Sequence, residues 1–339
     1  MISITDIISK TTKSLGGGTG HFSLLRGLVG LNQPENITAV VGTWDSGGSS
    51  GKLRTELGIL PPGDLRQCLL ALMEDPKQRQ VAQKLFEDRL LEVKGPLKGH
   101  SMGNLITARL EQIYKGPDRG VDAERMLFRI SAKVLPVSLT DLHLIAQLSD
   151  GKEIEGETNI DIRGEKRNYN PKHKIQRIYF DAAADPNPEV LEAISNADKI
   201  IFSAGDLYTS VLPHLLVNGI KEAIATSGAQ VILVLNLMTK RGETDSYKAS
   251  DYLGAFVYYL EDQEIGAMIV NSNGLSPQIL RAYKKEGKEP VKVDEDNCQK
   301  IAPKMKIVKA PLAVYHIREH LLRHDPASLA KAILDIDKR

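Results

Sequence analysis

Cysteine, aromatic residues and long apolar runs are scarce in this 339-residue chain, and each scarcity excludes a class of protein. Two cysteines, Cys68 and Cys298, are too few and too far apart for a disulfide framework or a zinc knuckle. Aromatic residues make up 5% and show no pattern suited to stacking nucleic-acid bases. No apolar run approaches the length of a membrane span, and the N-terminus lacks the features of a signal peptide. We therefore expect a cytoplasmic protein with no membrane span.

Charge is nearly balanced, since 44 basic and 43 acidic side chains give a net charge of +1. A general nucleic-acid binder usually carries a strong basic excess, so we expect no nucleic-acid partner. The balance still allows a local cationic pocket. Hydrophobic residues make up 42%, enough for a substantial core. No shift in composition marks a linker and no internal repeat is visible, so we predict a single α/β domain over residues 1–339.

Short apolar runs alternate with helical patterns along the chain. The runs at 37–41, 199–202, 231–235 and 267–270 predict buried strands of a parallel sheet, because they do not alternate polar with apolar residues. Helices are predicted at 22–30, 65–73, 104–113, 189–195, 212–218 and 326–336. This order is typical of a Rossmann-like, doubly wound α/β fold with a mostly parallel sheet. Residues 133–181 break the rhythm, and Ser149-Asp150-Gly151 is a hairpin signal, so we predict an antiparallel β insertion there.

A first glycine-rich loop precedes the helix predicted from Phe22. Its residues are Gly16, Gly17, Gly18, Thr19 and Gly20. Glycines before a helix expose backbone N–H groups at the positive end of the helix dipole, which favours phosphate binding over the alternative of a flexible turn. The dinucleotide fingerprint G-x-G-x-x-G does not fit, because His21 and Ser23 stand where it requires glycine.

A second glycine-rich loop follows the strand predicted at 37–41. Its candidate ligand-binding residues are Asp45, Ser46, Gly47, Gly48, Ser49, Ser50 and Arg54. An acid at this position contacts a ribose hydroxyl in many nucleotide-binding α/β folds. Alternatively, Asp45 is a metal ligand, since Mg²⁺ prefers one or two carboxylates together with phosphate oxygens. The alternative without a ligand is a solvated surface loop.

Four further polar turns extend this pattern, and those that follow a predicted strand lie beyond its carboxyl end, where open α/β sheets bind ligands. They add the candidates Gly63, Asp64, Arg66, His100, Ser101, Asn104, Gly205, Asp206, Tyr208, Thr209, Ser210, Asn236 and Thr239. Asp64 also suits a helix N-cap. His100 is either an acid/base group or, more often in such a turn, a structural residue. We expect Arg54 and Arg66 to face one crevice and contact ligand phosphate.

Six motifs occur in order from Gly16 to Ile336: GGGTG, DSGGSSGKLR…LGILPPGDLR, GHSMGN, GDLYTS…LPHLL, NLMT…GETD and HDP. As a set they resemble the bacterial gluconeogenesis factor (YvcK-like) family, which shares a superfamily with the CofD-like 2-phospho-L-lactate transferases. The resemblance implies a CofD-like Rossmann fold and a nucleotide-sugar ligand, with UDP-sugars leading. It also implies a link to carbon metabolism, cell-wall precursor supply and cell shape, with a regulatory protein partner or a homo-oligomer as expected assemblies. For the transferase branch it implies a nucleotide diphosphate donor and Mg²⁺.

Departures from the family pattern bear on function. Ser46 replaces a second aspartate, so one carboxylate for Mg²⁺ is missing. Asp206 stands in place of a small serine and adds negative charge near the expected phosphate site. The first strand, at residues 10–15, carries two lysines, so we expect it to be frayed or at an edge.

Three functions are compared on these grounds: a nucleotide-sugar-binding regulator, a transferase of a phosphorylated group, and a nicotinamide-linked oxidoreductase. The broken fingerprint at His21 counts against the oxidoreductase, and Ser46 favours the regulator over the transferase. Trp44, the sole tryptophan, is either a neighbour of the ligand or an apolar plug beneath the loop.

Overall fold

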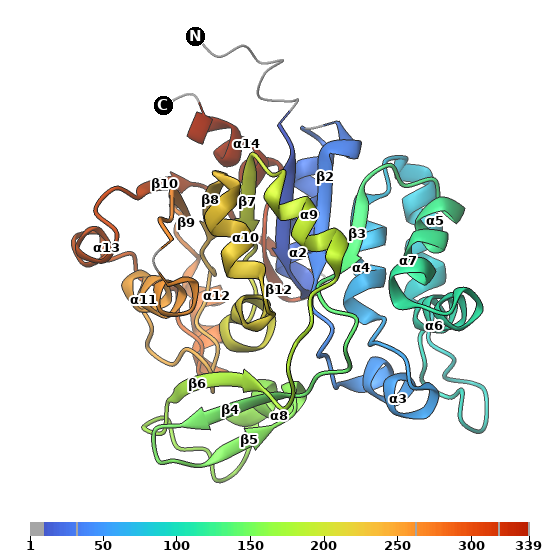
Figure 1. Ribbon diagram of the computed structural model, residues 1–339. Helices are drawn as coiled ribbons and strands as arrows, with labels where there is room; N and C mark the ends of the chain where they lie inside the picture. The colour runs from blue at the N-terminus through green and yellow to red at the C-terminus, as the bar shows by residue number, and fades with distance from the viewer. Residues whose placement is uncertain (1–9, 32, 262, 318, 338–339) are drawn as a thin grey trace.

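A seven-stranded parallel sheet forms the centre of the molecule, which we describe from a computed structural model over residues 10–31, 33–261, 263–317 and 319–337. The strand order is β10-β9-β8-β7-β1-β2-β3 (Figure 1). The strands are β1 (Thr12–Gly16), β2 (Ile37–Val41), β3 (Lys133–Pro136), β7 (Lys199–Phe202), β8 (Gln230–Val234), β9 (Ala267–Asn271) and β10 (Lys306–Ala310). The α/β fold with a parallel sheet is confirmed, and every pairing in this sheet is parallel.

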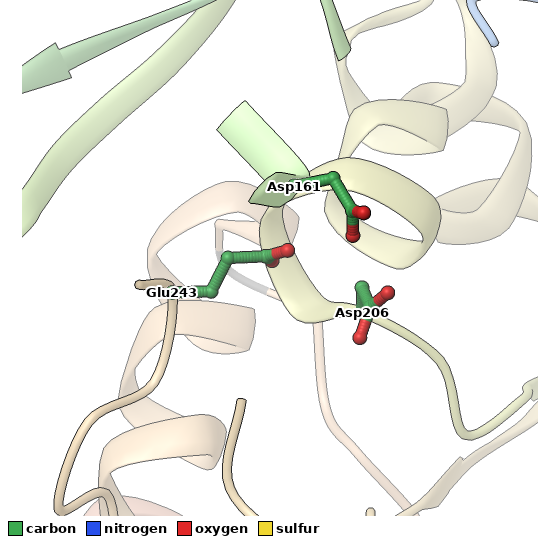
Figure 2. Close-up of side chains that lie close together, drawn as sticks. All are labelled: Asp161, Asp206 and Glu243. Carbon is green, nitrogen blue, oxygen red and sulfur yellow. The ribbon is translucent and has the colours of Figure 1, made fainter. Parts of the chain in front are cut away.

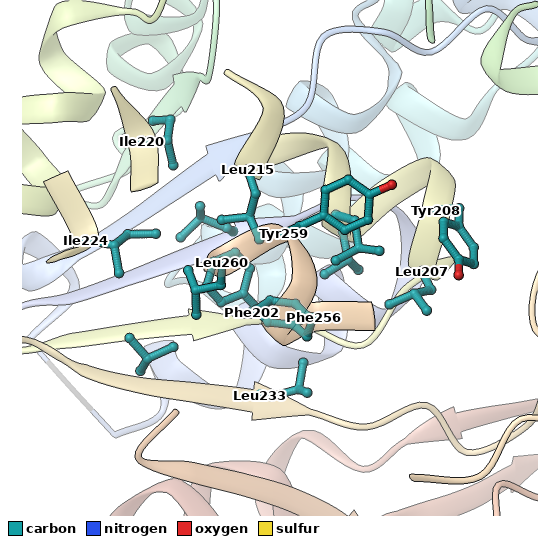
Figure 3. Close-up of a cluster of buried hydrophobic side chains, with 14 of the residues drawn as sticks. Phe202, Leu207, Tyr208, Leu215, Ile220, Ile224, Leu233, Phe256, Tyr259 and Leu260 are labelled. Atoms are coloured by element: carbon teal, nitrogen blue, oxygen red, sulfur yellow. The ribbon is translucent and has the colours of Figure 1, made fainter. Parts of the chain in front are cut away.

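Helices cover both faces of the sheet, which explains why most residues of its strands are apolar. One face packs against α9 (Pro188–Ser195), α10 (Ile220–Ser227), α11 (Ala249–Leu260) and α13 (Glu295–Ile301). The core on this side includes Phe202 and Phe256, whose rings meet edge to face with centroids 4.6 Å apart (Figure 3). The other face packs against α2 (Gly18–Val29), α4 (Gly63–Leu72), α5 (Pro76–Glu87) and α14 (Pro326–Asp337).

Strand β1 lies at the centre of the sheet, so the expectation of a frayed or edge strand is wrong. It pairs with β2 on one side and β7 on the other, and all five of its residues are buried. Its polar side chains have partners: the Lys13 ammonium donates to the Thr38 hydroxyl at 3.3 Å, and the Ser14 hydroxyl lies 2.9 Å from the His21 ring. Burial lowers the pKa of Lys13. A central strand therefore tolerates these residues because their polar atoms are satisfied locally.

Two small antiparallel sheets flank the large one. The first has the order β5-β4-β6 and is formed by β4 (Leu144–Leu148), β5 (Glu153–Glu155) and β6 (Ile175–Phe180), together with α8 (Glu157–Asp161) and η2 (Ile162–Glu165). It lies at the lower end of the view in Figure 1. We call residues 144–180 the insertion. Its hairpin turn at Ser149–Gly151 is confirmed, but β3 belongs to the parallel sheet, so the antiparallel segment begins later than the predicted residue 133. The second sheet pairs β11 (Ala313–His316) with β12 (Leu321–His324).

Two helical predictions require correction. The segment Gly48–Leu57, expected to be loop, is the helix α3, and residues 207–216 form a π-helical turn, η3 (Leu207–Val211), followed by a 3₁₀ turn, η4 (Leu212–Leu216), rather than an α-helix at 212–218. The remaining elements are η1 (Pro34–Asn36), α6 (Met102–Tyr114), α7 (Pro117–Leu127) and α12 (Pro277–Lys285). Within the described ranges, every helix falls short of the length and apolarity that a membrane crossing requires.

Candidate functional site

Two adjoining chambers lie where the parallel strands end. Strand β1 is followed along the chain by β2 on one side and later flanked by β7 on the other, so the strand order reverses at β1, the point where open α/β sheets bind ligands. The first chamber has a volume of about 300 Å³. We call it the cationic chamber because Lys240, Lys288 and Arg323 line it beside the glycine loop, with Asp206 as its single lining carboxylate among the residues that the structure describes. His324 also lines it, but burial lowers the pKa of this histidine to about 4 and so favours its neutral form.

The second chamber has a volume of about 240 Å³ and shares part of its wall, including Gly17 and Ser210, with the first. We call it the acidic chamber. It is lined by five carboxylate side chains, which are Asp45, Asp64, Glu157, Asp161 and Asp206. None of its lining residues among the described part of the chain is lysine, arginine or histidine. Phosphate is therefore favoured in the cationic chamber and repelled from the acidic one unless a cation accompanies it.

The glycine loop stands between the two chambers. Gly17 and Gly18 line both, and Thr19 and Gly20 line the cationic chamber at the start of α2. Gly18 has a φ of +62°, a left-handed conformation that favours glycine. Glycine is also required at position 17, where an added Cβ would come within 2.4 Å of the Asp64 carboxylate. The first turn of α2, the positive end of the helix dipole, thus lies at the cationic chamber, which favours an anion there.

Asp64, in the first turn of α4, is hydrogen-bonded to the glycine loop. The predicted N-cap is not observed, because the helix begins at Gly63 and the Asp64 carboxylate instead accepts a hydrogen bond from the Gly18 N–H at 3.1 Å. Burial, with a smaller contribution from the charge of Asp45, raises the pKa of Asp64 to about 6. A carboxyl group with such a pKa is readily neutralised by a proton or a cation near neutral pH.

Asp45 lies in the acidic chamber, in the short loop between β2 and α3. Its carboxylate accepts a hydrogen bond from the Gly47 N–H at 2.8 Å, and burial raises its pKa. Ser46 does not line either chamber, since its hydroxyl accepts a hydrogen bond from the Thr158 N–H at 3.0 Å in the insertion. Gly47 is the N-cap of α3 and Gly48 its first residue.

At one side of the acidic chamber, the insertion contacts the loops after β7 and β8. The Lys240 ammonium donates to Asp161 at 2.5 Å and to Asp206 at 3.1 Å. Glu243 lies beside them, and ligand atoms of Asp161, Asp206 and Glu243 lie within 4.8 Å of one another (Figure 2). Burial raises the pKa of both Asp206 and Glu243, whereas these acids raise the pKa of Lys240 against the opposing effect of its own burial.

The loops after β7 and β8 bring further candidates together. Gly205 and Asn236 line the cationic chamber and bond to each other, because the Asn236 side chain accepts from the Gly205 N–H at 3.2 Å and donates to its carbonyl at 2.7 Å. Thr239 lines the same chamber, and Thr209 lines the acidic one. Tyr208 lines neither chamber, since its hydroxyl lies 2.9 Å from that of Tyr247.

The structure does not bring Arg54 and Arg66 into either chamber. The Arg54 guanidinium donates through Nε to Asp141 at 2.6 Å and through Nη2 to the Leu142 carbonyl at 2.6 Å, and only 5% of the residue is exposed. The Arg66 Nε donates to the Asn104 side chain at 2.9 Å. Both arginines therefore hold elements together beneath the site.

The turn that contains His100, Ser101 and Asn104 makes contacts within the fold and does not reach either chamber. His100 is buried, and its Nδ1 lies 2.9 Å from the Ser49 hydroxyl. Ser101 is the N-cap of α6, and Asn104 lies 3.4 Å from the Ser50 hydroxyl. None of these residues lines a chamber, and neither do Ser49, Ser50 and Gly63.

Trp44 was expected to be either a neighbour of the ligand or an apolar plug beneath the loop, and its position has features of both. It is 3% exposed, its indole N–H donates to the Thr209 carbonyl at 2.6 Å, and its ring packs against Phe180 and His214. It nevertheless lines the acidic chamber. The ring is thus a buried wall of the site.

Several lining residues were not predicted from the sequence. They are Glu157 and Asp161 in the insertion, Lys240 and Lys288 after β8 and α12, and Arg323 and His324 on β12. The GETD motif contains Glu243, but Lys240, three residues earlier, lies outside every motif identified in the sequence. For Glu157 and Asp161 the sequence offers no signal, because only the folded position of the insertion brings them to the chamber.

Comparison with known proteins shows the family of the chain. Residues 14–313 match the model of the family described as 2-phospho-L-lactate transferase CofD. A relative from Thermotoga maritima is 41% identical over 96% of this chain and 98% of its own. The gluconeogenesis factor of Halalkalibacterium halodurans is 38% identical, covering 96% of both chains. A crystal structure of a Bacillus halodurans protein, a member of the UPF0052 family, is similar with a TM-score of 0.86 at 38% identity, covering 96% of this chain and 100% of that one.

Proposed function

Since the chain belongs to the CofD family and is related over nearly its whole length to gluconeogenesis factors, we propose that its two chambers bind a nucleoside diphosphate sugar. UDP-sugars are the leading ligands. The protein acts as a regulator that reports the supply of such sugars to carbon metabolism, cell-wall precursor supply and cell shape, through a protein partner or its own oligomer. The observation that carries the proposal is the glycine loop at the strand-order reversal, with cationic side chains on one side and carboxylates on the other.

The diphosphate belongs in the cationic chamber. Backbone N–H groups at the start of α2 and the side chains of Lys240, Lys288 and Arg323 supply positive charge there. Apolar and aromatic side chains in the same chamber, among them Leu237 and Tyr283, offer a surface for the base. This division supports a ligand with one charged and one apolar part, which a nucleoside diphosphate is.

A transferase that uses Mg²⁺ is the second candidate function, and the acidic chamber favours it. Loss of the aspartate at position 46 leaves five lining carboxylates, so Ser46 no longer argues strongly against a cation. Oxygen ligands of this kind suit Mg²⁺, and Asp161, Asp206 and the neighbouring Glu243, whose ligand atoms lie within 4.8 Å of one another, would hold it. The ion would neutralise charge on the diphosphate.

Calorimetric titration with UDP-glucose, with either EDTA or Mg²⁺ present, separates the two functions. Binding that persists in EDTA supports the regulator, and binding that requires Mg²⁺ supports the transferase. In thermal or chemical unfolding, ligand at a hundredfold excess over Kd should add about 2.7 kcal/mol to the free energy of unfolding. Lys288→Gln should weaken binding at least tenfold, whereas Lys284→Gln, on the exposed side of α12, should not. No binding of any nucleoside diphosphate or its sugars under either condition would overturn the proposal.

A further inference from the structure

The insertion reaches the acidic chamber through its helix α8. Of the residues that line this chamber, Glu157 and Asp161 come from the insertion. The others come from loops after the strands of the parallel sheet, from β1, from η3 or from the start of α2 and α4. The insertion therefore contributes only to the acidic chamber, since no residue of 144–180 lines the cationic one. The proposed function places the diphosphate in the cationic chamber. The insertion then faces the group that is attached to the diphosphate, which in the proposed ligand is the sugar.

Several contacts fix α8 at this wall. The Ser46 hydroxyl accepts from the Thr158 N–H at 3.0 Å and lies 3.1 Å from its hydroxyl, and the Ser46 N–H points to Glu157 at 3.4 Å. Lys240 bonds to Asp161 at the other end of the helix. Glu157 and Asp161 are thus held in place at both ends of α8, as the residues of a preformed binding wall must be.

The two chambers differ in the chemistry that they can accept. Carboxylates accept hydrogen bonds from hydroxyl groups but repel anions at short range. Burial, together with the charges of Asp45 and Asp161, raises the pKa of Glu157 to about 8. The other carboxylates therefore supply most of the repulsion at neutral pH, and Glu157 adds to it as the pH rises above about 8. The ring of Trp44 adds an apolar surface to the same chamber. A group with several hydroxyls and apolar C–H edges, but without negative charge, therefore fits this space.

We propose that the acidic chamber holds the sugar of the ligand, and that Glu157 and Asp161 of the insertion select an uncharged, hydroxyl-bearing sugar over an acidic one. The cationic chamber binds the nucleoside diphosphate without regard to the sugar. The cationic chamber thus sets the affinity for the nucleoside diphosphate, and the acidic chamber sets the preference among sugars. The inference rests on the proposed function and adds the class of sugar and the residues that select it.

Two ligands that differ at one carbon test this selection. UDP-glucose and UDP-glucuronate share the nucleotide and the ring, but the second has a carboxylate in place of the C6 hydroxymethyl group. Calorimetry in EDTA should show UDP-glucose binding at least tenfold more tightly than UDP-glucuronate. UDP serves as the reference ligand that occupies the cationic chamber alone.

A charge reversal then tests the role of the insertion. Measured above about pH 8, where Glu157 is ionised, and expressed relative to the affinity of the same variant for UDP, Glu157→Lys should reverse the preference in favour of UDP-glucuronate and Glu157→Gln should weaken UDP-glucose binding severalfold. Glu155→Lys and Glu155→Gln are matched controls, because Glu155 is an exposed glutamate two residues earlier in the insertion and lines neither chamber. Retained UDP binding shows that each variant is folded.

The outcomes separate the inference from its premise. Failure of wild-type protein to bind UDP or UDP-glucose, with or without Mg²⁺, would overturn the proposed function and this inference with it. If UDP and UDP-glucose bind but UDP-glucuronate binds equally well, or if Glu157→Lys changes the affinity for all three ligands by the same factor, the proposed function stands and the selective role of the insertion is overturned.

Discussion

The ammonium nitrogen of Lys240 lies 3.1 Å from a carboxylate oxygen of Asp206, at the boundary between the cationic and acidic chambers. The aspartate that stands in place of a small residue in the family pattern thus has a cationic partner. This pairing lowers the charge that Lys240 can offer to a phosphate. It also keeps a carboxylate close to any anion bound at the glycine loop.

Replacing Asp206 by serine should therefore tighten the binding of UDP-glucose in the absence of divalent cations. Removal of one nearby negative charge and release of Lys240 should together gain roughly tenfold in affinity, about 1.4 kcal/mol. Calorimetry in EDTA measures the change. Asp185→Ser, the same change of charge at an exposed residue that lines neither chamber, should have no effect. Weaker binding in Asp206→Ser would mean that Asp206 itself contacts the ligand and that the phosphate lies elsewhere.

Arg54 should affect stability rather than ligand affinity. Its buried guanidinium joins α3 to Asp141 and to the Leu142 carbonyl, just before the insertion. Arg54→Ala removes these charge-assisted hydrogen bonds and leaves the carbonyl without a donor, so the free energy of unfolding should fall by roughly 2–4 kcal/mol. Urea denaturation measures the loss, and Arg109→Ala on the exposed face of α6 is the control. A large loss of UDP affinity in a variant of unchanged stability would restore Arg54 as a phosphate contact.

Glu124 should make stability depend on pH. It is fully buried in α7, and burial raises its pKa to about 7 against the opposing effects of the Thr107 side chain and the charge of Arg66. The unfolded chain loses this proton near the usual glutamate pKa of 4.5, while the folded chain keeps it up to about pH 7. Because the folded state binds the proton more tightly, the contribution to stability is favourable at low pH and is lost as pH rises from about 4.5 to about 7.

Glu124→Gln removes this ionisation and isolates its effect. The variant should be more stable than wild type at pH 8, by on the order of 1–3 kcal/mol, and the difference should shrink toward pH 4.5. Urea denaturation at a series of pH values measures the difference, with Glu56→Gln at an exposed position of α3 as the control. A difference that does not vary with pH would show that Glu124 is not the group that titrates.

Local patterns in the sequence predicted much of the parallel sheet but little of the acidic chamber. The apolar runs at 37–41 and 199–202 are β2 and β7 to the residue, since a strand buried on both faces requires such runs. Helix α3 was missed because Gly47 to Gly51 are poor helix formers, and its stability comes from tertiary contacts such as the packing of Leu53 against Ala108.

Contacts between distant segments explain the remaining differences. Strand β1 was misplaced because polar residues in a central strand depend on partners such as Thr38, which a single segment does not reveal. The glycine loop, Asp45, Asp64 and Asp206 were predicted to share a crevice, and Gly16 to Gly18 line the acidic chamber together with these three aspartates. Asp161 joins them from more than a hundred residues beyond Asp45, and its approach depends on how the insertion packs.

The sole tryptophan should report occupation of the acidic chamber. The Trp44 ring is buried against Phe180 and His214 and forms part of the chamber wall, and its N–H bonds to Thr209, another lining residue. A sugar that enters the chamber displaces water from the ring and changes its surroundings. Indole emission should therefore change saturably on addition of UDP-glucose, and much less on addition of UDP, which leaves the acidic chamber free.

Asp45→Ala should move this saturable change to higher UDP-glucose concentrations while the protein remains folded. Asp45 follows Trp44 in the chain and lines the same chamber. Its carboxylate bonds to the Gly47 N–H within the same short loop, so its removal should cost only about 1 kcal/mol of stability. Fluorescence titration beside calorimetry on the same samples measures both quantities. Unchanged emission in samples where calorimetry detects UDP-glucose binding would make Trp44 a purely structural plug, and would place the sugar away from the Asp45 loop.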